Sequence, residues 1–259
     1  HWPYADVDHG DGDGNSSRRI RVWSGDEPHF AEHFHAGHPG NCLTESRTRG
    51  TSLMTAPLQP TFRSMIDITS LTVTKRGQTI CQIANATVAQ HSTVGVTGPN
   101  GSGKSTLLRV MAGIENAFIG ECFVDATVTD RVLVHQSPYL FSGTVLSNVE
   151  YGLKARSISK STRHDQATLW LERFGVAHLA RRSVESLSGG EKRRTALARA
   201  CVLEPKLLLF DEPLADLDPR GVECVVQSLN MLDASTILIT SPAPLPADLT
   251  QATISLKQD

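Results

Sequence analysis

The stretch Gly98-Pro99-Asn100-Gly101-Ser102-Gly103-Lys104-Ser105-Thr106 satisfies the pattern G-x-x-x-x-G-K-[ST]. Its glycines let the backbone curl, so that successive N–H groups can point inward at phosphate oxygens. A β-branched run at 93–97 precedes it and a helical pattern at 104–112 follows, which aims the positive end of the predicted helix at the same place. We expect Lys104 to contact the β- and γ-phosphates of a nucleotide and the Ser105 hydroxyl to bind Mg²⁺.

A second motif is the apolar run 207–210, which ends in Asp211 and Glu212. The pattern predicts a buried strand whose carboxyl end carries both acids. We expect Asp211 to hold Mg²⁺ through water and Glu212 to polarise an attacking water as general base. The alternative, a strand end that carries solvated acids, is disfavoured because the phosphate loop is in the same chain.

Short apolar runs with helical patterns between them extend on both sides of these motifs. Strands are predicted around 66–73, 80–88, 93–97, 131–134, 207–210, 236–240 and 252–256. Between residues 142 and 186 the pattern is helical, with Leu169, Leu171, Phe174 and Leu179 as its apolar positions. The arrangement predicts an α/β fold, with a sheet that is covered on both faces.

Three further motifs carry a resemblance to a known family. Leu187-Ser188-Gly189-Gly190-Glu191 resembles the signature motif of ATP-binding-cassette (ABC) ATPases, Gln136 resembles their Q-loop glutamine, and Leu217-Asp218 resembles their D-loop. The resemblance covers about residues 65–257. It implies a P-loop NTPase core of ABC type, with an antiparallel β-subdomain and a helical subdomain inserted at about 138–190.

The resemblance also implies a mechanism that needs two chains and uses ATP and Mg²⁺. Two cassettes would dimerise head to tail around two ATP molecules, so that Ser188, Gly189 and Gly190 meet the γ-phosphate held by the partner's Lys104. Ser188 begins a predicted helix at about 191–202, whose N-terminus suits a phosphate. Glu212, Gln136 and Lys104 would be catalytic. The Mg²⁺ ligands would be Ser105, Gln136 and Asp211.

Two positions depart from the family pattern. Ser241 stands where the family has a switch histidine, and no histidine follows His178. A serine hydroxyl is shorter and cannot become cationic, so we expect slowed hydrolysis or reliance on Glu212 alone. Near 75–77, where the family places an adenine-stacking aromatic, Arg76 either stacks on the base or belongs to a solvated hairpin tip.

The segment 138–154 indicates which kind of cassette this is, because it resembles importer cassettes, most closely the compact tungstate or molybdate type. Tyr139, Leu140 and Phe141 either contact a membrane permease or only pack the helical lobe. The expected partners are a second cassette, a permease at the inner face of the cell membrane and a substrate-binding protein. An export or haem-handling cassette and a non-transport cassette are the alternatives.

The composition of the 259 residues bounds the remaining possibilities. The net charge of −2 gives no reason to expect a nucleic-acid partner, and the five cysteines lie singly, without the spacing of a disulfide framework. No apolar run approaches the roughly 20 residues that cross a bilayer. Residues 1–64 are predicted to be a disordered leader, with His29, His33, His35 and His38 as a less favoured metal site. A start at Met54 or Met65 would leave this leader outside the native protein.

Overall fold

The computed structural model describes residues 63–257. Its centre is a five-stranded parallel sheet in the order β5-β6-β7-β3-β8. These strands are β5 (Arg131–Val134), β6 (Leu207–Phe210), β7 (Thr236–Ser241), β3 (Thr93–Thr97) and β8 (Ala252–Ser255). All five lie where the apolar runs predicted them, and the α/β class with its parallel core is confirmed. The predicted leader and its histidines lie outside the described residues, apart from the end at 63–64.

A second sheet is antiparallel and has the order β2-β1-β4. Strand β1 (Ser64–Lys75) forms a hairpin with β2 (Gln78–Ala89), and β4 (Ile119–Val124) pairs with the other edge of β1. Strand β1 starts one residue before the predicted boundary at 65. Strand β4 was not predicted: its apolar residues Ile119 and Phe123 are exposed, so that no buried apolar run marks it.

The core lies on both faces of the parallel sheet, because side chains along each strand alternate. In β6, Leu207 and Leu209 join the apolar cluster beneath α1 (Lys104–Met111) and the antiparallel sheet. Leu208 and Phe210 join the cluster on the opposite face, toward α4 (Gly189–Cys201) and α5 (Pro219–Leu229). All four side chains are buried, which explains the continuous apolar run of this strand.

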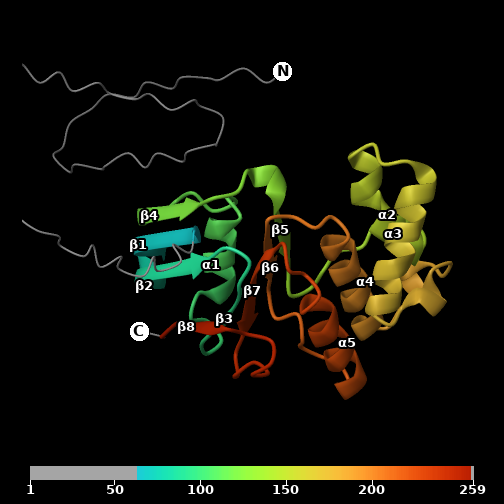
Figure 1. Cartoon of the computed structure of the whole chain (residues 1–259). Helices are drawn as coiled ribbons and strands as arrows, with labels where there is room; N and C mark the ends of the chain where they lie inside the picture. Colours follow the sequence, from blue (N-terminus) through green and yellow to red (C-terminus); the bar gives the residue numbers. More distant parts are fainter. Residues whose placement is uncertain (1–62, 258–259) are drawn as a thin grey trace, which may run out of the picture.

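The helical insert lies beyond α4, on the side away from the antiparallel sheet (Figure 1). It contains α2 (Val145–Ala155), α3 (Lys160–Arg173) and the single 3₁₀ turns Ala177–Leu179 and Val184–Ser186; a further 3₁₀ turn, Val128–Asp130, precedes β5. Three of the four apolar positions of the predicted helical pattern, Leu171, Phe174 and Leu179, are buried. Leu169, another apolar position of this helical pattern, is 45% exposed, and the neighbouring Trp170 is buried. Within residues 63–257, no helix is long and apolar enough to span a bilayer.

Candidate functional site

The phosphate loop joins the end of β3 to the first residue of α1 and closes against β2. Gly103, the N-cap of α1, has φ 87°, a left-handed conformation that favours glycine. A Cβ at Gly103 would collide with the carbonyl oxygen of Ile80 and would lie 2.7 Å from Cys81 Cβ. Among residues 63–257, no side chain accepts a hydrogen bond from the first N–H groups of this helix. The loop therefore presents donors at the positive end of a helix.

Lys104 follows this loop and lies almost entirely within the protein. Its side chain is 5% exposed, and Nζ donates to the carbonyl oxygens of Gly98 at 2.8 Å and Pro99 at 3.1 Å. The same Nζ lies 3.8 Å from Glu212 Oε1. The ammonium group is thus fixed between the phosphate loop and the end of β6.

Glu212 is held by two other contacts besides this ion pair. Its Oε2 accepts a 2.8 Å hydrogen bond from Gln136 Nε2, and its backbone N–H donates to Thr240 Oγ1 at 2.9 Å. Glu212 has φ 49°, which is uncommon for a residue with a side chain. The predicted Q-loop glutamine and the predicted general base are therefore in direct contact.

Asp211 lies beside Glu212 and is 7% exposed. Its N–H donates to Val134 O at 2.9 Å, which ties it to the end of β5. Its Oδ1 accepts a 2.8 Å hydrogen bond from Thr240 Oγ1, on the other neighbouring strand. The two acids at the end of β6 are thus anchored to both flanking strands.

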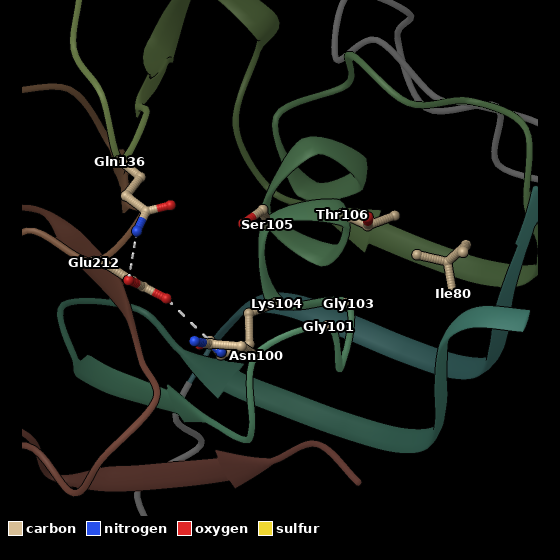
Figure 2. Close-up of a pocket in the computed structure, with 9 residues that line it drawn as sticks. All are labelled: Ile80, Asn100, Gly101, Gly103, Lys104, Ser105, Thr106, Gln136 and Glu212. Atoms are coloured by element: carbon tan, nitrogen blue, oxygen red, sulfur yellow. Dashed lines mark hydrogen bonds and ion pairs between the residues drawn. The ribbon is translucent and has the colours of Figure 1, made fainter. Parts of the chain in front are cut away.

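Lys104, Gln136 and Glu212 line one cleft of about 320 Å³ (Figure 2), and Asp211 lies next to Glu212 in the chain. Figure 2 shows Gln136 and Glu212 on one side of it, opposite Lys104 and Asn100. The lining residues are Ile80, Asn100, Gly101, Gly103, Lys104, Ser105, Thr106, Gln136 and Glu212. The structure thus brings the phosphate loop together with the predicted general base and the Q-loop glutamine.

Several predicted site residues are not among those that line this cleft. Gly98, Pro99 and Ser102 of the phosphate loop and the acid Asp211 lie within two positions of lining residues in the chain. The others lie on separate elements. The signature residues Ser188, Gly189 and Gly190 lie at the start of α4, and Asp218 is the N-cap of α5, where its side chain accepts from Gly221 N–H at 2.9 Å. Ser241 Oγ accepts from Ala243 N–H at 3.2 Å. Arg76 lies in the β1–β2 turn with φ 51°.

The start of α4 is a complete capping box. Ser188 Oγ accepts from Glu191 N–H, while Glu191 Oε2 accepts from the Ser188 N–H at 2.8 Å and from its hydroxyl at 2.9 Å. These hydrogen bonds lower the pKa of Glu191 below its usual value. The bond from the Ser188 backbone N–H has the largest effect on this pKa, followed by that from the Ser188 hydroxyl. The predicted helix therefore begins two residues earlier than expected, with Ser188 as its cap.

Three residues around the site were missed by the sequence analysis. Ile80 lines the cleft from β2, and Thr240 bonds to both acids from β7. Arg193, on α4, donates from Nη2 to the carbonyl oxygen of Gln136 at 2.9 Å. Thr240 reaches the site because β7 pairs with β6, and Ile80 reaches it because β2 of the antiparallel sheet packs against the phosphate loop. The sequence shows neither contact. Arg193 follows the signature motif by only a few residues, but its contact crosses to another loop.

Comparison with known proteins places this geometry in a family. The family model described as ABC transporter matches residues 81–215. The tungstate uptake system ATP-binding protein TupC of Peptoclostridium acidaminophilum is 32% identical over 184 residues, which cover 68% of this chain and 86% of TupC. The Fe(3+) ions import ATP-binding protein FbpC of Streptomyces avermitilis is 38% identical over 177 residues, 65% of this chain. The aligned region covers 51% of that FbpC, so this chain spans about half the length of that relative.

Solved structures agree with the family match. The ATP-binding cassette MJ0796, described as a dimer in a post-hydrolysis state bound to ADP and Pi, is 26% identical with a TM-score of 0.67. The similarity covers 74% of this chain and 94% of that one. The fold, the order of the motifs and these matches lead to one conclusion: the chain belongs to the ABC transporter family and contains its ATPase cassette.

Proposed function

We propose that this chain is the ATP-binding and ATP-hydrolysing subunit of an ABC importer. The observation that carries the proposal is the position of Glu212, held by Gln136 on one side and Lys104 on the other at the mouth of the phosphate loop. Lys104 and the backbone N–H groups at 103–106 bind the phosphates. Glu212 takes a proton from the attacking water, and Gln136 keeps the Glu212 carboxylate in place.

The side chains around the cleft also suit Mg²⁺. Ser105, Asp211 and Gln136 offer a hydroxyl, a carboxylate and an amide oxygen, the hard oxygen ligands that Mg²⁺ accepts alongside phosphates. The Gln136 amide nitrogen is bound to Glu212, which leaves its amide oxygen as the end free for a cation. When bound, the ion neutralises charge on the β- and γ-phosphates.

The signature motif supports the proposal that the working unit is a homodimer. Ser188, Gly189 and Gly190 are not among the residues lining the cleft, yet they form the N-terminus of a helix of 13 residues, which is a suitable anion site. In a head-to-tail dimer they contact the γ-phosphate bound to the partner's Lys104. The dimeric cassette MJ0796, found with ADP and Pi, is a precedent for such an assembly.

An aromatic patch of Tyr139, Phe141 and Tyr151 is the proposed contact for a membrane permease. Tyr139 is 71% exposed and Tyr151 54% exposed, and both rings lie against Phe141, at 5.7 Å and 4.4 Å between centroids. Leu140, in contrast, packs against the core. Tyr139 lies three positions after Gln136, so a permease docked here at the inner face of the membrane can sense the nucleotide site.

For the cargo we propose an oxyanion such as tungstate or molybdate, delivered by a substrate-binding protein. The similarity to TupC supports this, because it extends over 86% of that protein. Ferric iron is the second candidate, because FbpC of Streptomyces avermitilis is 38% identical over the aligned region.

Uptake measurements in cells that carry or lack this chain test the proposal. We expect the strain without it to lose tungstate uptake and to keep ferric-ion uptake. Re-expression of the wild-type chain restores uptake, whereas Lys104→Ala does not. Loss of ferric-ion uptake alone would identify the second candidate, and unchanged uptake of both ions would overturn an import function for either. Co-purification of a permease with the wild-type chain tests the membrane partner.

A further inference from the structure

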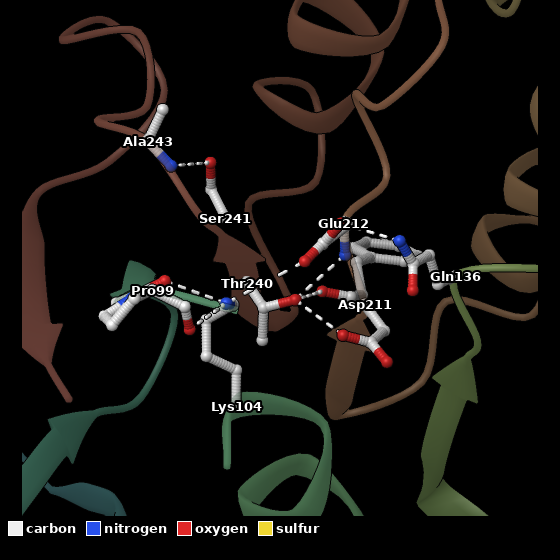
Figure 3. Close-up of polar contacts among 10 residues, drawn as sticks. Pro99, Lys104, Gln136, Asp211, Glu212, Thr240, Ser241 and Ala243 are labelled. Carbon is white, nitrogen blue, oxygen red and sulfur yellow. Dashed lines mark hydrogen bonds and ion pairs between the residues drawn. The ribbon is translucent and has the colours of Figure 1, made fainter. Parts of the chain in front are cut away.

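Thr240 connects the two acids at the end of β6. It is fully buried in β7, and its hydroxyl contacts Glu212 N–H at 2.9 Å and Asp211 Oδ1 at 2.8 Å (Figure 3). The Thr240 hydroxyl oxygen accepts the Glu212 N–H. The hydroxyl has one proton of its own, so it can donate to only one acceptor. Asp211 Oδ1, at 2.8 Å, is closer than the alternative acceptor, Phe210 O at 3.5 Å, and therefore receives the proton.

The two acids need such an anchor because the chain leaves the sheet at this point. Asp211 N–H is bound to Val134 O on the β5 side. Glu212 has φ 49°, and a backbone in this region persists only where its surroundings hold it. On the β7 side the support comes from a side chain, the Thr240 hydroxyl. Rotation of the peptide before Glu212 would move its carboxylate away from Gln136.

We propose that Thr240 is a positioning residue for ATP hydrolysis, an inference that rests on the proposed roles of Asp211 and Glu212. By bonding to Oδ1, Thr240 fixes the Asp211 carboxylate in one orientation and leaves Oδ2 for the cation. By accepting from the Glu212 N–H, it fixes the backbone that carries the general base. Through these two bonds, a single hydroxyl sets the distance between the metal-binding acid and the base.

The neighbouring hydroxyl does not duplicate this role. Ser241 is the next residue of β7, and Figure 3 shows its side chain turned away from the two acids toward Ala243. Ser241 therefore cannot make the hydrogen bonds that Thr240 makes to Asp211 and Glu212.

The same strand contains a matched control. Thr236 is also fully buried, and its hydroxyl also accepts a backbone N–H, that of His91 at 2.8 Å. It lies at the opposite end of β7, away from the phosphate loop. Thr236→Val and Thr240→Val therefore remove the same kind of buried hydrogen bond, but only Thr240→Val removes it beside the acids.

The experiment compares Thr240→Val, Thr240→Ser, Thr236→Val and Glu212→Gln in the full chain. Three quantities are measured: the melting temperature, the affinity for a fluorescent ATP analogue with and without Mg²⁺, and the steady-state ATPase rate over a Mg²⁺ titration. For Thr240→Val we expect kcat to fall about 10- to 100-fold and the half-saturating Mg²⁺ concentration to rise about tenfold. The KM for ATP stays within about twofold, because Lys104 and the loop are untouched.

Binding without turnover gives an independent readout. Mg²⁺ should tighten analogue binding to the wild type, and this gain should shrink in Thr240→Val, while the affinity in EDTA stays the same. Thr240→Ser should restore both the rate and the Mg²⁺ response. Thr236→Val should lower the melting temperature but leave the ATPase rate and the Mg²⁺ response unchanged.

Several results would overturn the inference. It fails if Thr240→Val keeps the wild-type kcat and Mg²⁺ response, or if Thr236→Val loses activity to the same degree. Where the valine variant does not fold, Thr240→Cys takes its place, because a thiol fills the space with weaker hydrogen bonding; an unchanged Mg²⁺ response then overturns the inference. If Glu212→Gln hydrolyses ATP at the wild-type rate, the proposed role of Glu212 fails, which is a separate outcome.

Discussion

Gln136 Nε2 donates a 2.8 Å hydrogen bond to Glu212 Oε2, although the two residues are 76 positions apart in the chain. Gln136 follows β5 and Glu212 follows β6, and these strands are parallel neighbours. Their carboxyl ends therefore open at the same edge of the sheet, where ligands bind in open α/β folds. The bond links the segment that leads into the helical insert with the group proposed to activate water.

The first prediction concerns Glu212→Gln. We expect kcat to fall at least about 100-fold, because an amide cannot accept the proton of the attacking water. Affinity for ATP should rise, because the substitution removes a negative charge 3.8 Å from Lys104 Nζ. ATP binding and size-exclusion chromatography with ATP check both effects, and the variant should elute as a stable dimer. Glu172→Gln, on the exposed face of α3, is the control and should behave as the wild type.

A second prediction follows from the capping box of α4. The pKa of Glu191 is lowered in the folded protein, so its charged form contributes stability above the unfolded value near 4.5, and this is lost as the pH falls through the folded pKa. Glu191→Gln should lower the melting temperature by about 1–4 °C near neutral pH. The difference from the wild type should close as the pH falls below the unfolded value near 4.5 and through the lower folded pKa. A constant difference across this range, or an equal effect of Glu185→Gln, would contradict the prediction.

The sequence predicted those parts of the site that depend on local patterns. The glycine spacing of 98–106 specifies a tight turn before a helix, and the run Leu207–Phe210 is apolar at every position because both faces of β6 are covered. Ser188 was predicted to begin a helix. Its capping partner Glu191 was not named, although the two are only three positions apart and form a local pattern.

The remaining parts depend on which distant strands pair. Thr240 lies beside Asp211 because β6 and β7 are neighbours with Phe210 opposite Ile239, a register that no local pattern specifies. Strand β4 was missed because Ile119 and Phe123 face solvent, and Ile80 enters the cleft only because β2 passes the phosphate loop. At the predicted adenine position, Lys75 pairs with Glu115 at 2.6 Å rather than forming a purely solvated tip.

The third prediction concerns the switch position. Ser241 Oγ accepts from Ala243 N–H and points away from Glu212 (Figure 3), so this side chain gives the hydrolytic site no second proton-transfer group. Ser241→His introduces a longer side chain that can exchange a proton near neutral pH. We expect turnover to rise about tenfold. Ser241→Ala should leave the rate unchanged; equal rates for the histidine and alanine variants would contradict a hydrolytic role for this position.

The last prediction concerns Arg193, which joins α4 to the Q-loop. Its guanidinium donates to Gln136 O at 2.9 Å and lies 3.5 Å from Asp216 Oδ2, and its side chain is only 12% exposed. The Asp216 side chain is 88% exposed, so solvent weakens that ion pair. The hydrogen bond to Gln136 therefore dominates, and it fixes the residue that holds Glu212.

We accordingly expect Arg193→Met to lower kcat about tenfold, because the bond of a charged donor to Gln136 O is lost. Its melting temperature should not fall, because Nη1 is buried with no hydrogen-bond partner among residues 63–257 and methionine removes that donor. Asp216→Asn is the control and should stay within about twofold of the wild-type rate. ATPase assays and thermal melts of the two variants decide the matter. If Arg193→Met and Asp216→Asn lose the same amount of ATPase activity, the effect belongs to the Arg193–Asp216 ion pair. If Arg193→Met keeps the wild-type rate, Gln136 is positioned without the bond from Arg193.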